Sequence, residues 1–246
     1  MFKELSIVAI LFSAPSLSLA GEFYPDKNAF PVLSKNTVHC PKEWFDNYAT
    51  CRTLKMPLGY FDSISGLGFE APVGTITDGA SIPPFLIPLI GDRFNKEFSR
   101  AATLHDWYVH RVALDDGEYS YTKIQRMFYH ALLDSNVDPL KAKAMFLAVL
   151  VGANKYKLRI KTPPKKCTTD TPNCLRNYDA LLLAEGKVGV QPAYNVKGFS
   201  EKMKNSIESD EFKHINPLDL DALEELSLRI RTDLGLPDLE LIEIIE

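Results

Sequence analysis

The strongest periodic pattern in the chain is a series of three stretches between residues 95 and 153 in which apolar residues recur with helical spacing. The first, Asn95 to Ala113, ends at the turn signal Asp115-Asp116-Gly117, and the second runs from Thr122 to Leu133. The third, Leu140 to Ala153, follows an Asp-Pro pair typical of a helix start and is apolar almost all round, which predicts a buried helix. We therefore expect an antiparallel helical core.

The pattern that precedes this core is typical of short strands. Leu54 to Ile76 contains several glycines and short apolar runs, which predict two or three strands. Ile82 to Gly91 is apolar but contains three prolines, which exclude a regular helix or a central strand. The expected fold class is α+β, with a small antiparallel sheet followed by the helical core.

The last part of the chain predicts a helical tail. Leu223, Leu226, Ile230 and Leu234 form a stripe that ends at Gly235, and apolar and acidic residues alternate from Leu239 to Ile245. This acidic tail is either an appendage on the main domain or an arm that binds a partner. The expected division is a leader over 1–20, an irregular disulfide-clipped arm over 21–53, a main domain over 54–186, and a connector with the tail over 187–246.

The overall composition narrows the possible partners. The chain is 46% hydrophobic and 24% charged, which is typical of a globular protein, and its net charge is -4. Proteins that bind nucleic acid usually carry a basic patch or a high pI. We therefore do not expect a nucleic acid partner.

Residues 1–20 have the pattern of a secretory signal peptide. A lysine near the start is followed by an apolar stretch from Leu5 to about Phe12 and by the small-x-small sequence Ser18-Leu19-Ala20. A membrane anchor needs about 20 apolar residues, and Pro15 and several serines interrupt this run. We expect cleavage after Ala20, a periplasmic or secreted location, and no transmembrane anchor.

Four cysteines follow this leader, at Cys40, Cys51, Cys167 and Cys174. An oxidising compartment favours disulfides, and none of the spacings is the CxxC of a zinc knuckle. Because closing a short loop costs the least chain entropy, we expect the pairs Cys40–Cys51 and Cys167–Cys174.

Candidate chemistry is concentrated between Ile76 and Val112. At ~100° per residue, His105 lies near the centre of the apolar face of the first predicted helix and should point inward, with Asp106 at its edge and Trp107 on the other side. The turn at Thr77-Asp78-Gly79 can bring Asp78 opposite His105. His105 and His110 are five positions apart, not the four of a zinc-binding helix.

These residues resemble a known family. The string Thr77-Asp78-Gly79-Ala80-Ser81-Ile82-Pro83, followed by Arg100-Ala101-Ala102-Thr103-Leu104-His105-Asp106-Trp107 and Arg126-Met127-Phe128-Tyr129-His130-Ala131-Leu132, resembles the domain of unknown function 1353 family of bacteria and phages. The likeness covers about Leu58 to Gly152 and supplies candidate positions at Asp78, Ser81, His105 and Asp106, but no reaction. Two positions depart from the family: Val109 replaces a common Tyr, and Gln125 replaces a common Asp.

The first functional hypothesis is an exported hydrolase that acts on peptidoglycan or lipid. A buried imidazole held by a carboxylate can act as a general base or as a metal ligand. His105 would take this role, Asp78 would orient it, and Asp106 would be a second acid. These three ligands and a water would also suffice for a divalent ion such as zinc or calcium.

Two other interpretations remain open. The His-Asp pair also looks like phospholipase A2, but a glycine-rich calcium loop does not precede His105, and the partner acid is Gln125. Alternatively, His105 is a core histidine hydrogen-bonded to Asp78 in a non-enzymatic envelope or phage-derived structural or binding protein. His130 projects away from the apolar face of its helix, and we expect it to be solvated.

Overall fold

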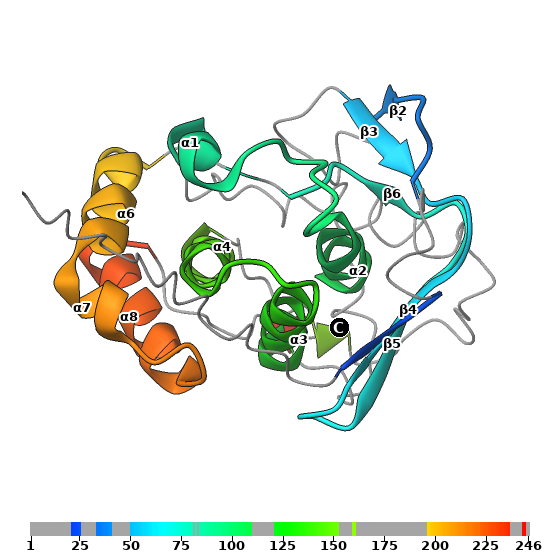
Figure 1. Ribbon diagram of the computed structural model, residues 1–246. Helices are drawn as coiled ribbons and strands as arrows, with labels where there is room; N and C mark the ends of the chain where they lie inside the picture. The colour runs from blue at the N-terminus through cyan, green and yellow to red at the C-terminus, as the bar shows by residue number, and fades with distance from the viewer. Residues whose placement is uncertain are drawn as a thin grey trace, which may run out of the picture.

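The computed structural model describes residues 21–25, 33–40, 50–80, 82, 84–109, 121–152, 159–160, 196–236 and 243–244 of the 246. Within these ranges the chain forms six short strands before its helices and two further two-residue strands among and after them, which confirms the α+β prediction. The strands between residues 22 and 77 lie on one side of the molecule, next to the helices that carry the candidate residues (Figure 1).

The first sheet supplies a wall for the helical core. Its strands are β1 (Glu22–Tyr24), β4 (Leu58–Asp62) and β5 (Leu67–Ala71), in the antiparallel order β1-β4-β5. Side chains alternate between the two faces of a strand, and the buried positions of β4 are Leu58, Tyr60 and Asp62. This alternation places one acidic side chain, Asp62, on the face that packs against the helices.

The second sheet carries the disulfide and the candidate turn. It consists of β2 (Val38–His39), β3 (Thr50–Thr53) and β6 (Ile76–Thr77), in the antiparallel order β2-β3-β6. Cys40 and Cys51 form the expected disulfide, with an S–S distance of 2.03 Å.

The structure bears differently on the second expected disulfide and on the arm over residues 21–53. The other expected pair, Cys167 and Cys174, lies outside the described residues. The described parts of the arm over 21–53 are not irregular, because β1, β2 and β3 pair within the two sheets. A further two-residue strand, β7 (Arg159–Ile160), pairs in parallel with β8 (Glu243–Ile244).

The three helices expected between residues 95 and 153 are present. They are α2 (Ser99–Val109), α3 (Tyr121–Asp134) and α4 (Pro139–Gly152). Helix α4 lies between α3 and the C-terminal helices (Figure 1). Its side chains are buried on almost every side, as its apolar sequence predicts.

The proline-containing segment forms more helix than expected. A 3₁₀ turn, η1 (Pro84–Leu86), leads directly into the one-turn helix α1 (Ile87–Ile90). Pro88 lies in the first turn of α1, where a backbone N–H has no partner within the helix, so its ring is tolerated there. The prolines limit the length of this helix but do not prevent it.

The C-terminal helices belong to the same core as the rest of the domain. They are α6 (Phe199–Glu208), α7 (Asp210–His214) and α8 (Leu220–Asp233). The stripe predicted the third of these, but we did not anticipate α6 and α7, although Phe199, Met203 and Ile207 recur every four residues. Their buried apolar side chains join one cluster with those of α4.

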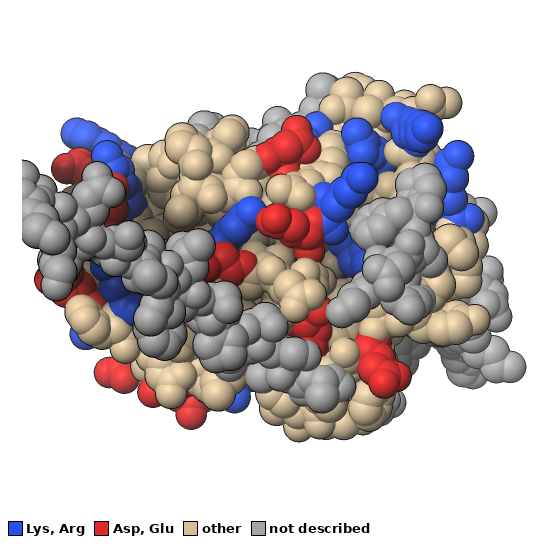
Figure 2. All heavy atoms as spheres, viewed as in Figure 1, with Lys and Arg blue, Asp and Glu red and all other residues tan. Residues whose placement is uncertain are grey.

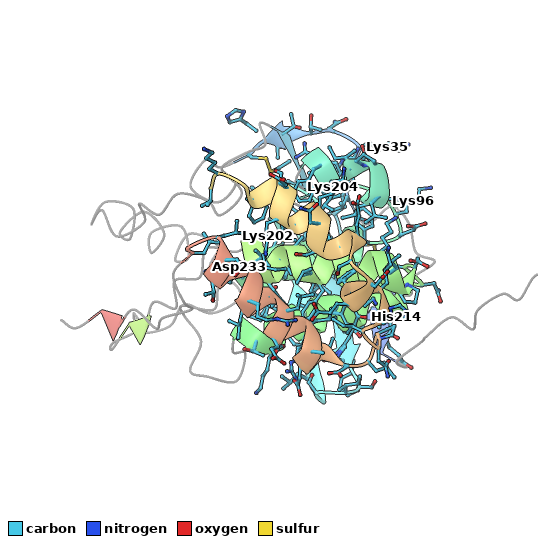
Figure 3. All side chains as sticks on the ribbon, turned by 90° about the vertical axis from the view of Figure 1, so that its left-hand side faces the viewer. Lys35, Lys96, Lys202, Lys204, His214 and Asp233 are labelled. Carbon is cyan, nitrogen blue, oxygen red and sulfur yellow. A yellow bond between two sulfur atoms is a disulfide. The ribbon has the colours of Figure 1, made fainter. Side chains whose placement is uncertain are left out.

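Polar contacts also connect this tail to the core. Arg231 donates to the carbonyl oxygen of Val151 at 2.8 Å, and the ammonium of Lys143 donates to the carbonyl oxygen of Phe212 at 2.8 Å. Lys202 and Asp233 form an ion pair between α6 and α8 on the face shown in Figure 3. These contacts favour an appendage packed on the domain over a separate arm for the helices up to Asp233.

The side of the molecule shown in Figure 2 has no large patch of described side chains with charges of one sign. Acidic and basic side chains are interspersed over its described atoms. In the part of the chain that the structure describes, the helices are too short or too polar to cross a bilayer.

Candidate acid-base site

The turn after β6 is held rigidly against the segment that leads into α2. The backbone N–H of Gly79 donates to Oγ1 of Thr77 at 2.9 Å, and the N–H of Ala80 donates to the carbonyl oxygen of Arg93 at 2.9 Å. Gly79 has a φ of +85°, and an added Cβ would lie 2.4 Å from that same carbonyl oxygen. Only glycine fits both the backbone angle and the space.

Helix α2 meets this turn through Asp106. Oγ1 of Thr77 donates to Oδ2 of Asp106 at 2.5 Å, and the backbone N–H of Asp78 also donates to the Asp106 carboxylate. Thr77 is fully buried, Asp78 is 2% exposed and Asp106 is 8% exposed. The two motifs that the sequence singled out therefore converge, and Asp106 is the residue that joins them.

The surroundings of Asp106 favour its protonated form. Burial raises the pKa of this carboxyl well above its ordinary value, and the neighbouring carboxylate of Asp78 raises it further. The hydrogen bonds from Thr77 and from the Asp78 amide oppose this rise only in part. A carboxyl whose pKa is raised by its surroundings is a candidate general acid.

His105, the preceding residue, turns toward α3. Its Nε2 lies 2.9 Å from Oε1 of Gln125, and its ring lies 4.7 Å from the ring of Phe128, measured between centroids. Because an amide oxygen only accepts, Nε2 carries the hydrogen and the lone pair of Nδ1 stays available as an acceptor.

The imidazole is neutral over most of the pH range. Burial lowers the pKa of His105 to about 4, although the hydrogen bond to Gln125 acts in the opposite direction. The residue as a whole is nevertheless only partly buried. A neutral imidazole with a free acceptor nitrogen can act as a general base.

The structure corrects the arrangement expected from the helical pattern. We expected Asp78 to orient His105, but the hydrogen bond of His105 is made with Gln125, and Asp78 lies against Asp106. Asp106 and Trp107 are each 8% exposed, whereas His105 is only partly buried. The apolar pattern placed Trp107 on the side of α2 away from the core. That side is also buried, because the sheets cover the face that a simple amphipathic helix would expose to solvent.

The expected three-ligand metal site does not form. Among the described residues, no three His, Cys, Asp or Glu side chains are grouped closely enough to hold a metal ion. Asp78, His105 and Asp106 therefore do not provide a common site for zinc or calcium, because His105 projects from α2 toward α3 and Asp106 toward the turn. Ser81 and His110 lie outside the described residues.

Gln125 is the residue that the sequence interpretation undervalued. It was identified only as a departure from the acid common at this position, yet it is fully buried and holds His105. Its amide nitrogen is buried without a hydrogen-bond partner in the described structure. This contact could have been predicted from the sequence, because His105 and Gln125 lie on two helices that were expected to pack side by side.

A second His-Asp pair was also missed. His130 is 5% exposed, not solvated as predicted, and its Nδ1 lies 3.0 Å from both carboxylate oxygens of Asp62. Burial by itself would raise the pKa of Asp62, but the hydrogen bonds from His130 and Ser65 lower it. The inward position of Asp62 on β4 indicates such a pair, because a buried acid requires a partner.

Comparisons with known proteins find one family and two relatives of this chain. Residues 52–149 match the family described as "Protein of unknown function (DUF1353)". The chain is 34% identical over 175 residues to the uncharacterized protein y4iH of Sinorhizobium fredii, which covers 70% of this chain and 66% of that protein. It is 32% identical over 115 residues to the uncharacterized protein y4jT of the same organism, over 46% of this chain and 32% of the relative.

The chain thus spans slightly less than two thirds of one relative and about a third of the other. No solved structure matches it significantly.

Proposed function

Residues 52–149 of the chain match the family of proteins of unknown function DUF1353, and we propose that the protein is an exported hydrolase of cell-envelope material. Its reacting groups are His105 as the general base and Asp106 as the general acid. Gln125 positions His105, and Thr77 and Asp78 position Asp106.

The observation that carries this proposal is the opposite shift of two adjacent titratable groups. Burial lowers the pKa of His105 to about 4 and raises the pKa of Asp106 well above its ordinary value. Burial thus favours the unprotonated form of one residue of α2 and the protonated form of the next. Pairs of groups whose pKa values are driven apart in this way are typical of acid-base catalysis.

The residues divide the reaction between them. Nδ1 of His105 accepts a proton from a water molecule, which becomes the nucleophile, while the hydrogen on Nε2 stays bound to Gln125. Because Asp106 faces the turn and His105 faces α3, the proposal requires a substrate that reaches both side chains, with its leaving group next to Asp106. Asp106 then gives its proton to that leaving group, and the Asp106 carboxylate that results is stabilised by donors from Thr77 and the Asp78 amide. No step is assigned to a metal, because the described residues do not provide three ligands.

The substrate class follows from the expected route of the protein. The leader pattern over residues 1–20 and the Cys40–Cys51 disulfide support an oxidising compartment outside the cytoplasm. Peptidoglycan and phospholipid are the abundant hydrolysable polymers and lipids of that compartment. The proposal covers both classes, and the assay distinguishes them.

The test is digestion of purified peptidoglycan and of phospholipid vesicles by the mature protein, with released sugars or peptides and released fatty acid as the two readouts. General acid-base groups contribute about 10²–10⁴-fold, so D106N and H105Q should each lose at least ~100-fold. The rate of the wild type should fall when the pH drops through about 4, as His105 takes up a proton. H214Q is the matched control, because His214 is an exposed residue of α7 on the face shown in Figure 3.

A second candidate is a non-enzymatic envelope or phage-derived binding protein. The burial of the turn favours it, since Thr77 and Asp78 are sealed from solvent and the contact with Asp106 pins the turn to α2. On this view neither substrate is cleaved by the wild type, and D106N and H105Q change only the melting temperature. That result would exclude the hydrolase.

A further inference from the structure

The first described residue of the chain, Gly21, lies in a polar site formed by β4 and the end of α3. Its backbone N–H donates to Oδ2 of Asp134 at 3.1 Å, and the hydroxyl of Tyr60 donates to the same oxygen at 2.7 Å. Asp134 is the last residue of α3 and is 6% exposed. Asp134 thus receives two donors from residues far away in the sequence.

The site has no room for a side chain at position 21. A Cβ on Gly21 would lie 2.4 Å from Oδ2 of Asp134 and 2.4 Å from the hydroxyl oxygen of Tyr60. The adjacent strand fixes this position, because Phe23 pairs with Tyr60 in the sheet and its ring lies 4.8 Å from the Tyr60 ring. The close fit concerns the first residue after the predicted cleavage point.

We propose that leader cleavage between Ala20 and Gly21 creates an α-ammonium group that binds Asp134 and Tyr60, so that processing adds a partly buried ion pair to the fold. This inference rests on the export part of the proposed function and not on its hydrolytic part. A leader peptidase uses one water molecule to break the Ala20–Gly21 bond. The carbonyl carbon of Ala20 gains the hydroxyl, and the Gly21 nitrogen leaves as an amine that is protonated at neutral pH.

Charge explains why the free end would bind more strongly than the uncleaved amide. An amide has one hydrogen to donate and no net charge, whereas the ammonium has three hydrogens and a positive charge. The end of α3 carries the negative pole of the helix dipole, which favours a cation at this position. The ammonium would also offset the charge of Asp134, which an amide cannot do.

The test compares two forms of the protein, one that begins at Gly21 and one that retains Ala20. The form that begins at Gly21 should melt higher by ~2–4 °C, which is the shift expected for one such interaction in a chain of this size. D134N should remove this difference, because it leaves no charge for the ammonium. Y60F, which keeps the carboxylate, should preserve the difference.

A second measurement does not depend on the stability of the variants. The Gly21 amine of the shorter form should react more slowly with an amine-selective acylating reagent at neutral pH than the Ala20 amine of the longer form. The N-terminal sequence of protein exported with its own leader should begin at Gly21.

Three results would overturn the proposal. They are a different mature N-terminus, an equal difference in melting temperature in D134N, and equal reactivity of the two amines. Only the first of these also counts against export, and none of them bears on hydrolysis.

Discussion

Oε1 of Gln125 accepts a hydrogen bond from Nε2 of His105 at 2.9 Å, across the contact between α3 and α2. This pair joins a residue of the His-Asp motif on α2 to a buried amide on α3. An amide fixes the tautomer of the imidazole without adding a charge, so burial alone dominates and the pKa of His105 falls to about 4. The neutral residue at position 125 therefore supplies no charge that would offset the effect of burial on His105.

Replacing Gln125 with glutamate should raise the pKa of His105. A carboxylate at hydrogen-bond distance stabilises the imidazolium, so the pKa should move from about 4 toward or beyond the ordinary value of 6.5. The measurement is an NMR titration of the histidine Cε1–H signals, with H105N used to assign the resonance. Gln125→Met, which adds no charge, is the control and should leave the pKa low. An unchanged titration in Q125E would show that the two side chains do not interact.

Asp106→Asn should change how stability depends on pH. The pKa of Asp106 is raised in the folded protein, so the stability that this group contributes is fully present below the ordinary carboxyl pKa of 3.8 and is lost as the pH rises toward the folded value. Asn cannot ionise and does not lose this contribution. The free energy of unfolding of D106N, relative to wild type, should therefore increase as the pH rises from 4 to 8.

Urea unfolding at several pH values provides this comparison. The exposed residue Asp210 supplies a matched control, D210N, which should follow the wild type across this range. A parallel dependence of D106N and wild type would mean that Asp106 is ionised in the folded protein.

Gly79→Ala should destabilise the protein far more than Gly74→Ala. Both glycines have a φ of +85°, so both substitutions pay the cost of a left-handed conformation, roughly 1–2 kcal/mol. At Gly79 the new Cβ would also lie 2.4 Å from the carbonyl oxygen of Arg93, whereas nothing lies within 4 Å at Gly74.

We expect a loss of about 3 kcal/mol or more for G79A, measured by thermal or urea unfolding. The matched pair separates the steric effect from the backbone effect. Equal losses at the two positions would show that the turn moves freely away from Arg93.

His130→Ala should be strongly destabilising, although sequence periodicity placed this residue on the surface. The substitution leaves Asp62, which is 1% exposed, without its principal partner. Removing one member of a buried pair typically costs about 3–5 kcal/mol, and the remaining bonds from Ser65 and the Ile64 amide should reduce this to roughly 2–3 kcal/mol.

His39→Ala is the control, because His39 is exposed on β2 and should change stability by less than ~0.5 kcal/mol. Comparable losses in H130A and H39A would contradict the buried pair. H130A tests the fold only, because the pair is separate from the proposed acid-base site.

Local pattern was enough to determine the main elements of this protein. The periodicity of residues 122–133 and 140–153 gave helices α3 and α4 within one or two residues. The short distance along the chain between Cys40 and Cys51 favoured their disulfide, and the glycine-rich stretch before Ile76 predicted the strands. These features depend on residues close together in the sequence, where spacing and backbone preference act directly.

Tertiary structure alone decided which polar groups meet. A helical projection assumes that α2 has one face exposed to solvent, but the sheets and α3 cover it on several sides. Enclosure buries Asp106 and Trp107, turns His105 toward Gln125, and pairs His130 with Asp62 across 68 residues. Buried polar groups take whichever partner the packing of distant elements brings within reach, and that partner is not encoded in the spacing of any single segment.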